Sequence, residues 1–345
     1  MICFAWNGFP QYAARCVAAF VRQTSERVAV VATRPDVPIQ GMEDVVGCPV
    51  KWISACEDCS LSECCGGIPD VLFVSGWATP VFNRFSDEVR SHGGRVIVAV
   101  DNNYIGGISE WLKLVRFRLR YRGRADGFMV PGSSGMRLLR YYGVSPERVY
   151  RGLYAADSTL FSGSRPLHSR AKRILFVGRF TERKNVLALC DAFLSTAMSK
   201  RIGWELALCG CGPLRDLIPQ ADEIRVFDFV QPEDLAKVYG DARVFVLPSK
   251  EEHWGLVVHE AALSGCLLLL SKQVGAAEDF VGVDNGILFD AFDRNALQAA
   301  LEGAMSYDRD ALCRAQAESV RLSARASLAL FVSEMNRFIQ ETVKS

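Results

Sequence analysis

The chain has 345 residues, of which 50% are hydrophobic and 23% charged, and its formal net charge is +1 at pH 7. This length suits two domains with separate cores, and the near-neutral charge gives no overall preference for a polyanion. No apolar run approaches the roughly 20 residues that a membrane-spanning helix needs. Met1 leads directly into a strand pattern without the basic and apolar regions of a secretory signal, so we expect a cytoplasmic protein.

Strand and helix patterns alternate along the first half of the chain. Short apolar and β-branched runs predict strands at 2–6, 27–32, 50–53, 71–75, 95–100, 127–130 and 148–150, with helices at 11–23 and 82–92. Strands that are apolar on both faces and separated by helices indicate a parallel sheet covered on two sides. We therefore predict a Rossmann-like domain over residues 1–160.

A stretch rich in Ser, Gly and Pro, residues 152–171, interrupts this alternation and predicts a domain boundary. A second series follows, with strands at 173–177, 204–209, 224–227, 242–247, 267–271 and 286–289 and helices at 185–198, 232–239 and 293–304. We predict a second Rossmann-like domain over residues 171–305 and a helical tail over 306–345. In open α/β sheets, ligands bind at the carboxyl ends of the strands, so we expect the site there.

Twelve cysteines are present, and most lie within apolar strand or helix patterns, where a free thiol behaves as a small hydrophobic residue. Without a secretion signal we expect them to be reduced. The exception is the run Cys56, Cys59, Cys64 and Cys65. Its density is compatible with a zinc or redox site as well as with a cysteine-rich surface loop, but it has no second CxxC pair and no nearby His. We expect no metal.

The most informative run is 248–265, which follows the predicted strand at 242–247. Glu252 lies in the loop, and Glu260 lies about two turns into the helix predicted after Gly255. The free N–H groups and the dipole at a helix start suit a phosphate, while carboxylates beside it suit the hydroxyls of a sugar. Taken alone, the pattern also fits an amphipathic helix with two solvated acids.

Two further segments carry chemistry. Gly178 follows a predicted strand, and Arg179 and Lys184 precede the next helix, which suits a diphosphate but also a solvated basic turn. A P-loop is excluded, because that motif needs Gly and Ser or Thr where this chain has Arg183 and Asn185. Gly210 belongs to the run 209–213 (CGCGP), which lacks the third glycine of a dinucleotide fingerprint.

Together with the runs 271–278 and 285–286, these segments resemble the retaining glycosyltransferases of family 4 over about residues 172–302. The resemblance implies a GT-B fold, in which two Rossmann-like α/β domains face a central cleft and a C-terminal helix packs back on the first domain. It implies that Arg179 and Lys184 contact the diphosphate, that Glu252 lies near the donor sugar, and that Glu260 binds ribose hydroxyls. The other residues that it places at the donor are Gly178, Gly210, Val230, His253, Trp254, Gly255 and Leu256.

The first domain matches the family less well. Gly8, in the first strand–helix turn, could bring backbone N–H groups to the donor phosphate or the acceptor, or could serve only as a turn. Many family members have a His after the strand that corresponds to 95–100, where this chain has Asp101. Asp101 is therefore a candidate catalytic residue that would hydrogen-bond the acceptor hydroxyl or act as a base, and an Asx turn is the alternative.

A basic stripe follows from Lys113 to Arg124, and it includes Arg116 and Arg120. It is interleaved with apolar residues, so it suits an acceptor, an anionic membrane surface at the inner face or, less well, a nucleic-acid backbone. A solvated helix face is the alternative. We favour the membrane, because acceptors of the resembled family are often lipid-linked.

The resemblance predicts a retaining, metal-independent hexosyltransferase without a cofactor. Its donor is a nucleotide diphosphate sugar, with UDP-sugar preferred over GDP-sugar, and its acceptor is a hydroxyl of a glycan or a lipid-linked saccharide, with modified nucleic acid as a further option. Arg179 and Lys184 would stabilise the leaving diphosphate by charge. Two alternatives remain open: an epimerase or phosphorylase on the same fold, and a non-catalytic subunit that binds sugar nucleotides. No obligate protein partner is indicated.

Overall fold

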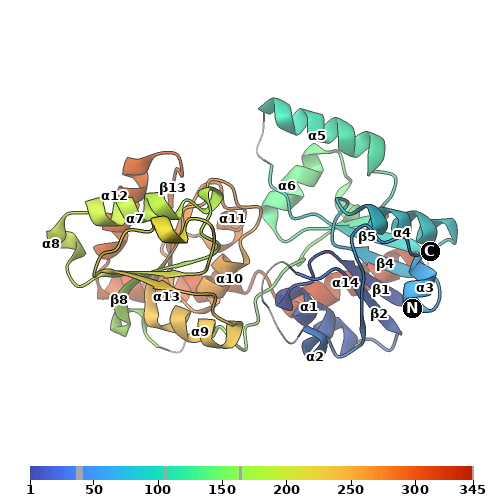
Figure 1. Ribbon diagram of the computed structural model, residues 1–345, viewed down its shortest axis with the longest axis horizontal. Coiled ribbons are helices and arrows are strands. Elements are labelled where there is room, and N and C mark those ends of the chain that lie inside the picture. Colours follow the sequence, from blue (N-terminus) through green and yellow to red (C-terminus); the bar gives the residue numbers. More distant parts are fainter. Residues whose placement is uncertain (36–41, 105–106, 163–164, 344–345) are drawn as a thin grey trace. The chain divides into compact units, whose positions relative to one another are not determined.

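The structure is a computed structural model that describes residues 1–35, 42–104, 107–162 and 165–343. The chain forms two compact units, one from Met1–Ala155 with Ala326–Ser345 and the other from Ala156–Arg325. Each unit is a parallel sheet with helices packed on it (Figure 1). None of the helices in these ranges is both long and apolar enough to cross a membrane.

The sheet of the first unit has seven strands in the order β3-β2-β1-β4-β5-β6-β7. The order reverses at β1, as in doubly wound Rossmann-type sheets. The strands are β1 (Ile2–Trp6), β2 (Val28–Ala32), β3 (Val50–Trp52), β4 (Val71–Val74), β5 (Arg95–Ala99), β6 (Gly127–Met129) and β7 (Val149–Tyr150). The helices are α1 (Gln11–Val21), α2 (Met42–Val46), α3 (Leu61–Cys65), α4 (Pro80–Ser91), α5 (Gly107–Arg120), α6 (Ser133–Tyr141) and α14 (Leu328–Val343).

The C-terminal helix α14 is an integral part of the first unit, where it packs on α1. Phe331 of α14 lies 6.3 Å from Phe4 of β1 between ring centroids, and Phe338 lies 5.3 Å from Tyr150 of β7. A Cβ at Gly127 would lie 2.9 Å from the ring of Phe338, so only glycine lets α14 approach β6 this closely. The predicted return of the C-terminal helix to the first domain is confirmed.

The sheet of the second unit has six strands in the order β10-β9-β8-β11-β12-β13. The strands are β8 (Ala171–Val177), β9 (Glu205–Cys209), β10 (Ile224–Phe227), β11 (Ala242–Leu247), β12 (Leu267–Ser271) and β13 (Gly286–Phe289). The helices are α7 (Val186–Ser195), α8 (Met198–Arg201), α9 (Pro232–Asp241), α10 (Leu256–Leu263), α11 (Ala277–Phe280), α12 (Arg294–Met305) and α13 (Arg309–Ser323). The predicted α/β class with two parallel sheets is confirmed.

Two details differ from the predictions. The helix predicted over 185–198 ends at Ser195, because Thr196 adopts an extended backbone and its hydroxyl donates to the Ala192 carbonyl. The predicted tail over 306–345 divides between the units. Its first helix, α13, packs on α10 and β12 in the second unit, and only α14 belongs to the first.

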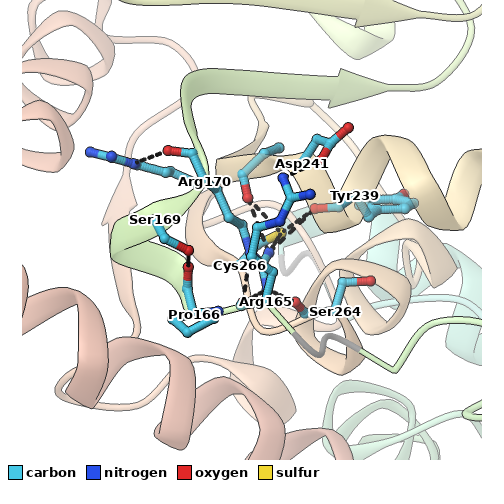
Figure 2. Close-up of polar contacts among 10 residues, drawn as sticks. Arg165, Pro166, Ser169, Arg170, Tyr239, Asp241, Ser264 and Cys266 are labelled. Carbon is cyan, nitrogen blue, oxygen red and sulfur yellow. Dashed lines mark hydrogen bonds and ion pairs between the residues drawn. The ribbon is translucent and has the colours of Figure 1, made fainter.

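A buried arginine holds the start of β8 to the elements around it (Figure 2). Arg170 is only 1% exposed, and its guanidinium donates to the carbonyl oxygens of Arg165, Tyr239, Ala242 and Ser264 over 2.7–3.3 Å. These carbonyls lie in the linker, at the end of α9, at the start of β11 and after α10. A single side chain thus fixes the relative positions of α9 and α10, which carry residues of the candidate site.

Candidate active site

The predicted donor residues of the second unit come from loops that follow neighbouring strands. β9, β8, β11 and β12 are adjacent in the sheet and all parallel, so their carboxyl ends lie at one edge. The loops after these strands contain, respectively, Gly210, the pair Arg179 and Lys184, Glu252, and Gln273. The sheet order therefore gathers residues that are far apart in the sequence.

The turns after β8 and β9 are joined by backbone hydrogen bonds. Gly178 N–H donates to the Cys209 carbonyl over 3.0 Å, and Phe180 N–H donates to the Cys211 carbonyl over 2.8 Å. A Cβ at Gly210 would lie only 2.0 Å from the Gly178 carbonyl oxygen. Glycine at 210 is thus required by the close approach of the two turns, and this contact holds the Arg179 loop in place.

Lys184 and Glu252 form a buried ion pair, in which Lys184 Nζ donates to Glu252 Oε2. Each residue is 9% exposed. Ser249 Oγ donates to the same carboxylate over 3.3 Å, and Arg183 Nη1 lies 3.8 Å from Oε1. The two residues that the sequence assigns to phosphate and sugar thus lie in direct contact. Sequence reasoning missed Arg183 and Ser249, although both lie within the segments it selected.

The Glu252 loop is held by the loop after β12. Glu252 N–H donates to the Gln273 carbonyl over 3.2 Å, and the Glu252 carbonyl accepts from Gly275 N–H over 3.0 Å. Trp254 is buried, its ring lies 5.6 Å from that of Phe280 between centroids, and its carbonyl accepts from Ala276 N–H over 3.0 Å. Trp254 therefore anchors the loop through its packing.

Helix α10 begins directly after this loop. Gly255 precedes it with φ +92°, in the left-handed region that favours glycine, and a Cβ there would lie 3.2 Å from Glu252 Cγ. No side chain caps the helix start, where Leu256 is the first residue. The first N–H groups of α10 are therefore not capped by a side chain, and they come shortly after Glu252 in the chain. The imidazole of His253 is partly exposed and lies 3.3 Å from Glu251.

Glu260 lies one turn into α10 and accepts a hydrogen bond of 2.9 Å from the hydroxyl of Tyr239 on α9. Desolvation raises the pKa of Glu260 to about 7, and the hydrogen bond from Tyr239 acts in the opposite direction. Tyr239 itself is fully buried. Sequence reasoning missed Tyr239, because a tyrosine in the apolar pattern of α9 is indistinguishable from a core residue.

The other predicted donor residues occupy different positions. Arg179 is exposed at the end of β8, and Val230 is partly exposed in the loop after β10. His259 of α10 was not among the predicted donor residues, and it is buried and neutral: its Nδ1 accepts from Ala156 N–H and its Nε2 donates to the Ser323 carbonyl, each over 3.0 Å. Burial lowers the pKa of His259 to about 4. His259 therefore serves the structure of the second unit.

Two predicted residues of the first unit lie after β1 and β5. Gly8 has φ +60°, and its N–H donates to Thr33 Oγ1 over 2.7 Å. Asp101 Oδ2 accepts from the hydroxyl of Tyr154 over 3.2 Å, and Tyr12 lies edge-on to Tyr154 at 5.1 Å. Burial raises the pKa of Tyr154, so its hydroxyl remains a donor to Asp101.

The basic stripe forms α5 and the turn after it. Arg116 and Arg120 are exposed and extend over the ring of Tyr121, each with its guanidinium carbon 5.9 Å from the ring centroid. In the cysteine run, Cys64 Sγ lies 3.6 Å from Cys59 Sγ, and Cys65 Sγ lies 3.5 Å from Cys3 Sγ. Within the described ranges, no group of three or more His, Cys, Asp or Glu side chains is placed to hold a metal ion.

Known proteins resemble this chain in sequence over part of its length and in fold over all of it. The profile of the family described as glycosyl transferases group 1 matches residues 171–306. The chain is 30% identical over 204 residues to D-inositol 3-phosphate glycosyltransferase of Corynebacterium kroppenstedtii, which covers 52% of this chain and 45% of that protein. It is 34% identical over 133 residues to O-antigen chain mannosyltransferase B of Escherichia coli, covering 36% and 34% of the two chains. The matched segments thus span less than half the length of these curated relatives.

Solved structures resemble the whole chain. The crystal structure of Anabaena HepE in complex with UDP and glucose covers 100% of this chain and 99% of that chain, with a TM-score of 0.75 and 14% sequence identity. At this identity the likeness concerns the fold. The profile match assigns residues 171–306 to the group 1 glycosyl transferases (family 4), and the likeness to solved structures gives the chain a GT-B fold.

Proposed function

We propose that the chain is a retaining hexosyltransferase that moves a sugar from a nucleotide diphosphate sugar to an acceptor hydroxyl. The observation that carries this proposal is the buried Lys184–Glu252 pair at the carboxyl edge of the second sheet. Glu252 lies in the loop that leads into α10. Positive charge, N–H groups without a side-chain cap and a carboxylate are the groups that a diphosphate sugar requires.

The roles of the residues follow from their chemistry. Arg179 and Lys184 would bind the diphosphate and stabilise the charge that develops on it as the sugar leaves, without a divalent ion. When the phosphate attracts Lys184, Glu252 becomes available to accept hydrogen bonds from the donor sugar. Glu260, in its ionised form, would accept hydrogen bonds from the ribose hydroxyls, and the start of α10 would contribute N–H groups. Gly178 and Gly210 would let the backbone of the two turns lie close to the donor.

On the acceptor side, Asp101 would accept a hydrogen bond from the attacking hydroxyl, with its carboxylate oriented by Tyr154. We propose a UDP-sugar as donor, because the fold is shared with HepE, whose structure contains UDP and glucose; a GDP-sugar is the second option. The acceptor in this proposal is a glycan or a lipid-linked saccharide, and the enzyme acts in the cytoplasm, at the inner face of a membrane.

The test begins with binding. UDP, GDP and their hexose derivatives are titrated by calorimetry against the wild type, Lys184→Ala, Glu252→Ala and the control Lys172→Ala, whose exposed side chain lies at the opposite end of β8. We expect Lys184→Ala to weaken UDP binding at least tenfold while the control binds as the wild type does. Equal affinities in all four proteins would refute the site assignment.

Transfer is then measured with the best donor and a panel of acceptors, in the presence and absence of EDTA. We expect activity that EDTA leaves unchanged, a product with the anomeric configuration of the donor, and loss of transfer in both alanine variants. Epimerisation of the nucleotide sugar without an acceptor would instead favour the epimerase alternative. Tight UDP binding without any turnover would favour the non-catalytic subunit.

A further inference from the structure

We propose that the outward face of α5 is a docking surface for an anionic lipid bilayer. This inference locates the proposed membrane contact on one helix face, and its test does not depend on sugar transfer. Four observations carry it: an exposed apolar stripe, a surrounding cluster of basic side chains, the lack of any Asp or Glu among residues 111–124, and the firm attachment of the opposite face to the core of the first unit.

The exposed stripe consists of Trp111, Leu112, Val115 and Leu119. Their spacing places them on one side of the helix, and Trp111, Leu112 and Leu119 are 55%, 58% and 84% exposed. Val115 is partly exposed and lies between them. A large aromatic and two leucines on one exposed helix face is unusual for a surface in contact only with water.

The inward side of the same helix is fully occupied. Phe117 and Tyr121 are buried in the core of the first unit, and the ring of Phe117 lies 4.9 Å from that of Tyr142 between centroids. The buried Glu110 carboxylate accepts a hydrogen bond of 2.7 Å from the hydroxyl of Tyr142. One side of α5 is therefore packed against the core of the first unit. The outer stripe is a second apolar surface, and it is exposed in this unit.

The charged residues that α5 and the turn after it contribute beside the stripe, within the described residues 111–124, are all of one sign. From Trp111 to Arg124 six residues are basic and none is acidic. Two acidic side chains pair with basic residues of this segment, and neither lies on the stripe. Glu110 is buried and pairs with Lys113 on the inward flank over 3.4 Å, and Asp87 pairs with Arg124 beyond the helix over 3.3 Å. Arg118 is exposed and lies, by helical spacing, on the side of the stripe next to Trp111, and Arg122 is exposed in the turn directly after the helix.

This combination fits a bilayer better than any other partner. A helix that lies in the membrane interface inserts Trp and Leu between the lipids while Arg and Lys bind the phosphates. α5 lies at the periphery of the first unit (Figure 1). A nucleic acid would use the arginines but would leave the leucines in water, so the apolar stripe argues for lipid.

The experiment uses the full chain and sedimentation with vesicles of equal parts phosphatidylglycerol and phosphatidylcholine, or of phosphatidylcholine alone, in about 0.1 M salt, where electrostatic attraction is still felt across about 10 Å. We expect binding to the anionic vesicles and little to the neutral ones. Arg118→Gln with Arg122→Gln should weaken binding about 25-fold, because each basic residue near an anionic surface contributes a factor of about five. Leu112→Ser with Leu119→Ser should weaken it about tenfold or more.

Matched controls lie in the second unit. Met198→Ser with Ile202→Ser removes two apolar side chains that are 60% and 69% exposed, and Lys172→Gln with Arg309→Gln removes two exposed charges. Both controls should bind vesicles as the wild type does. Equal losses in the controls and the α5 variants would overturn the proposal, because the attraction would then be a property of the whole surface.

A second measurement reports insertion directly. Vesicles with brominated acyl chains should quench tryptophan fluorescence in the wild type, and Trp111→Phe should lose most of that quenching while the other five tryptophans remain. Unchanged quenching in Trp111→Phe, or tighter binding of a short duplex DNA or RNA than of anionic vesicles, would overturn the assignment to lipid. All substituted side chains are exposed, and circular dichroism verifies that each variant is folded.

Discussion

Tyr239 of α9 donates a hydrogen bond to Glu260 of α10 over 2.9 Å, and this contact favours the charged form of the residue that we propose binds ribose. Desolvation raises the pKa of Glu260 from its usual 4.5 to about 7. Glu260 therefore gains its charge near neutral pH rather than in acid. The affinity for the nucleotide and the stability of the second unit should both depend on pH for this reason.

The first prediction concerns the affinity for UDP. An ionised carboxylate accepts hydrogen bonds from two hydroxyls better than a protonated one does, so the dissociation constant of UDP should fall severalfold from pH 6 to pH 8. Glu260→Gln should bind UDP more weakly and without this dependence. Tyr239→Phe removes the bond that lowers the pKa, so the transition should move to higher pH. Calorimetry between pH 5.5 and 8.5 measures all three, and a Glu260→Gln profile parallel to that of the wild type would contradict the assignment.

The second prediction concerns stability. Between about pH 4.5 and pH 7 Glu260 holds a proton in the folded state and has lost it in the unfolded state, so the free energy of unfolding falls as pH rises through this range. We expect the wild type to lose on the order of 2 kcal/mol relative to Glu260→Gln between pH 5 and pH 8. Urea unfolding of both proteins at each pH gives the difference. A constant difference would show that the carboxyl titrates normally.

The third prediction concerns the Lys184–Glu252 pair. Lys184→Met removes the nearer of the two cations beside a buried carboxylate and leaves only Arg183 at 3.8 Å. The change should cost about 3 kcal/mol, which corresponds to a fall in Tm of roughly 10 °C for a unit of this size. Combining it with Glu252→Gln removes the uncompensated charge and should restore most of the Tm. UDP binding should remain lost in both proteins. If the double variant bound UDP normally, the pair would be structural and the donor would bind elsewhere.

The fourth prediction concerns the turn after β9. Gly210→Ala places a methyl group 2.0 Å from the Gly178 carbonyl, so the turns after β8 and β9 must separate. We expect a loss of about 2 kcal/mol or more in stability and weaker UDP binding, since Arg179 follows Gly178. The control is Gly240→Ala in α9, where a Cβ meets nothing within 4 Å. Alanine there should be neutral or stabilise by up to about 1 kcal/mol.

The fifth prediction concerns Arg170. A lysine has the charge but cannot reach four carbonyls from one nitrogen, so Arg170→Lys should cost about 3 kcal/mol as buried carbonyls lose their donors. Arg165→Gln is the control, because the Arg165 side chain is 57% exposed and pairs with Asp241 at the surface. Its effect should be below about 0.5 kcal/mol. Chemical unfolding compares the two, and equal effects would contradict the structural role of the guanidinium.

Sequence patterns were sufficient for the fold class. Apolar runs separated by helical periodicity predicted nearly every strand of both sheets, because strands covered on two faces contain almost no polar residues. The strand order was not predicted from patterns. The ion pair between Lys184 and Glu252 depends on that order. β8 and β11 are separated in the chain by β9 and β10, yet they are neighbours in the sheet, so the loops that follow them meet. Each residue could be selected from the sequence, but their contact could not.

The surroundings of the site were harder to predict for a different reason. Tyr239 and the leucines of α5 are apolar residues at helical spacing, and the sequence does not show which side of a helix is covered. Leu119 thus resembles a core residue, yet it is 84% exposed. Arg170 belongs to a basic cluster in the linker, where nothing marks it as buried. Burial depends on how the elements pack together, so the positions of Tyr239, Leu119 and Arg170 inside or outside the core could be assigned only from the structure.

His259 joins two segments that lie near the connections between the two units. Its imidazole binds Ala156 and Ser323, and these residues lie next to the two places where the chain passes from one unit to the other. His259 is on α10, only one turn after Leu256. A single neutral ring thus holds residues 156 and 323, which are far apart in the sequence, against the same turn of α10.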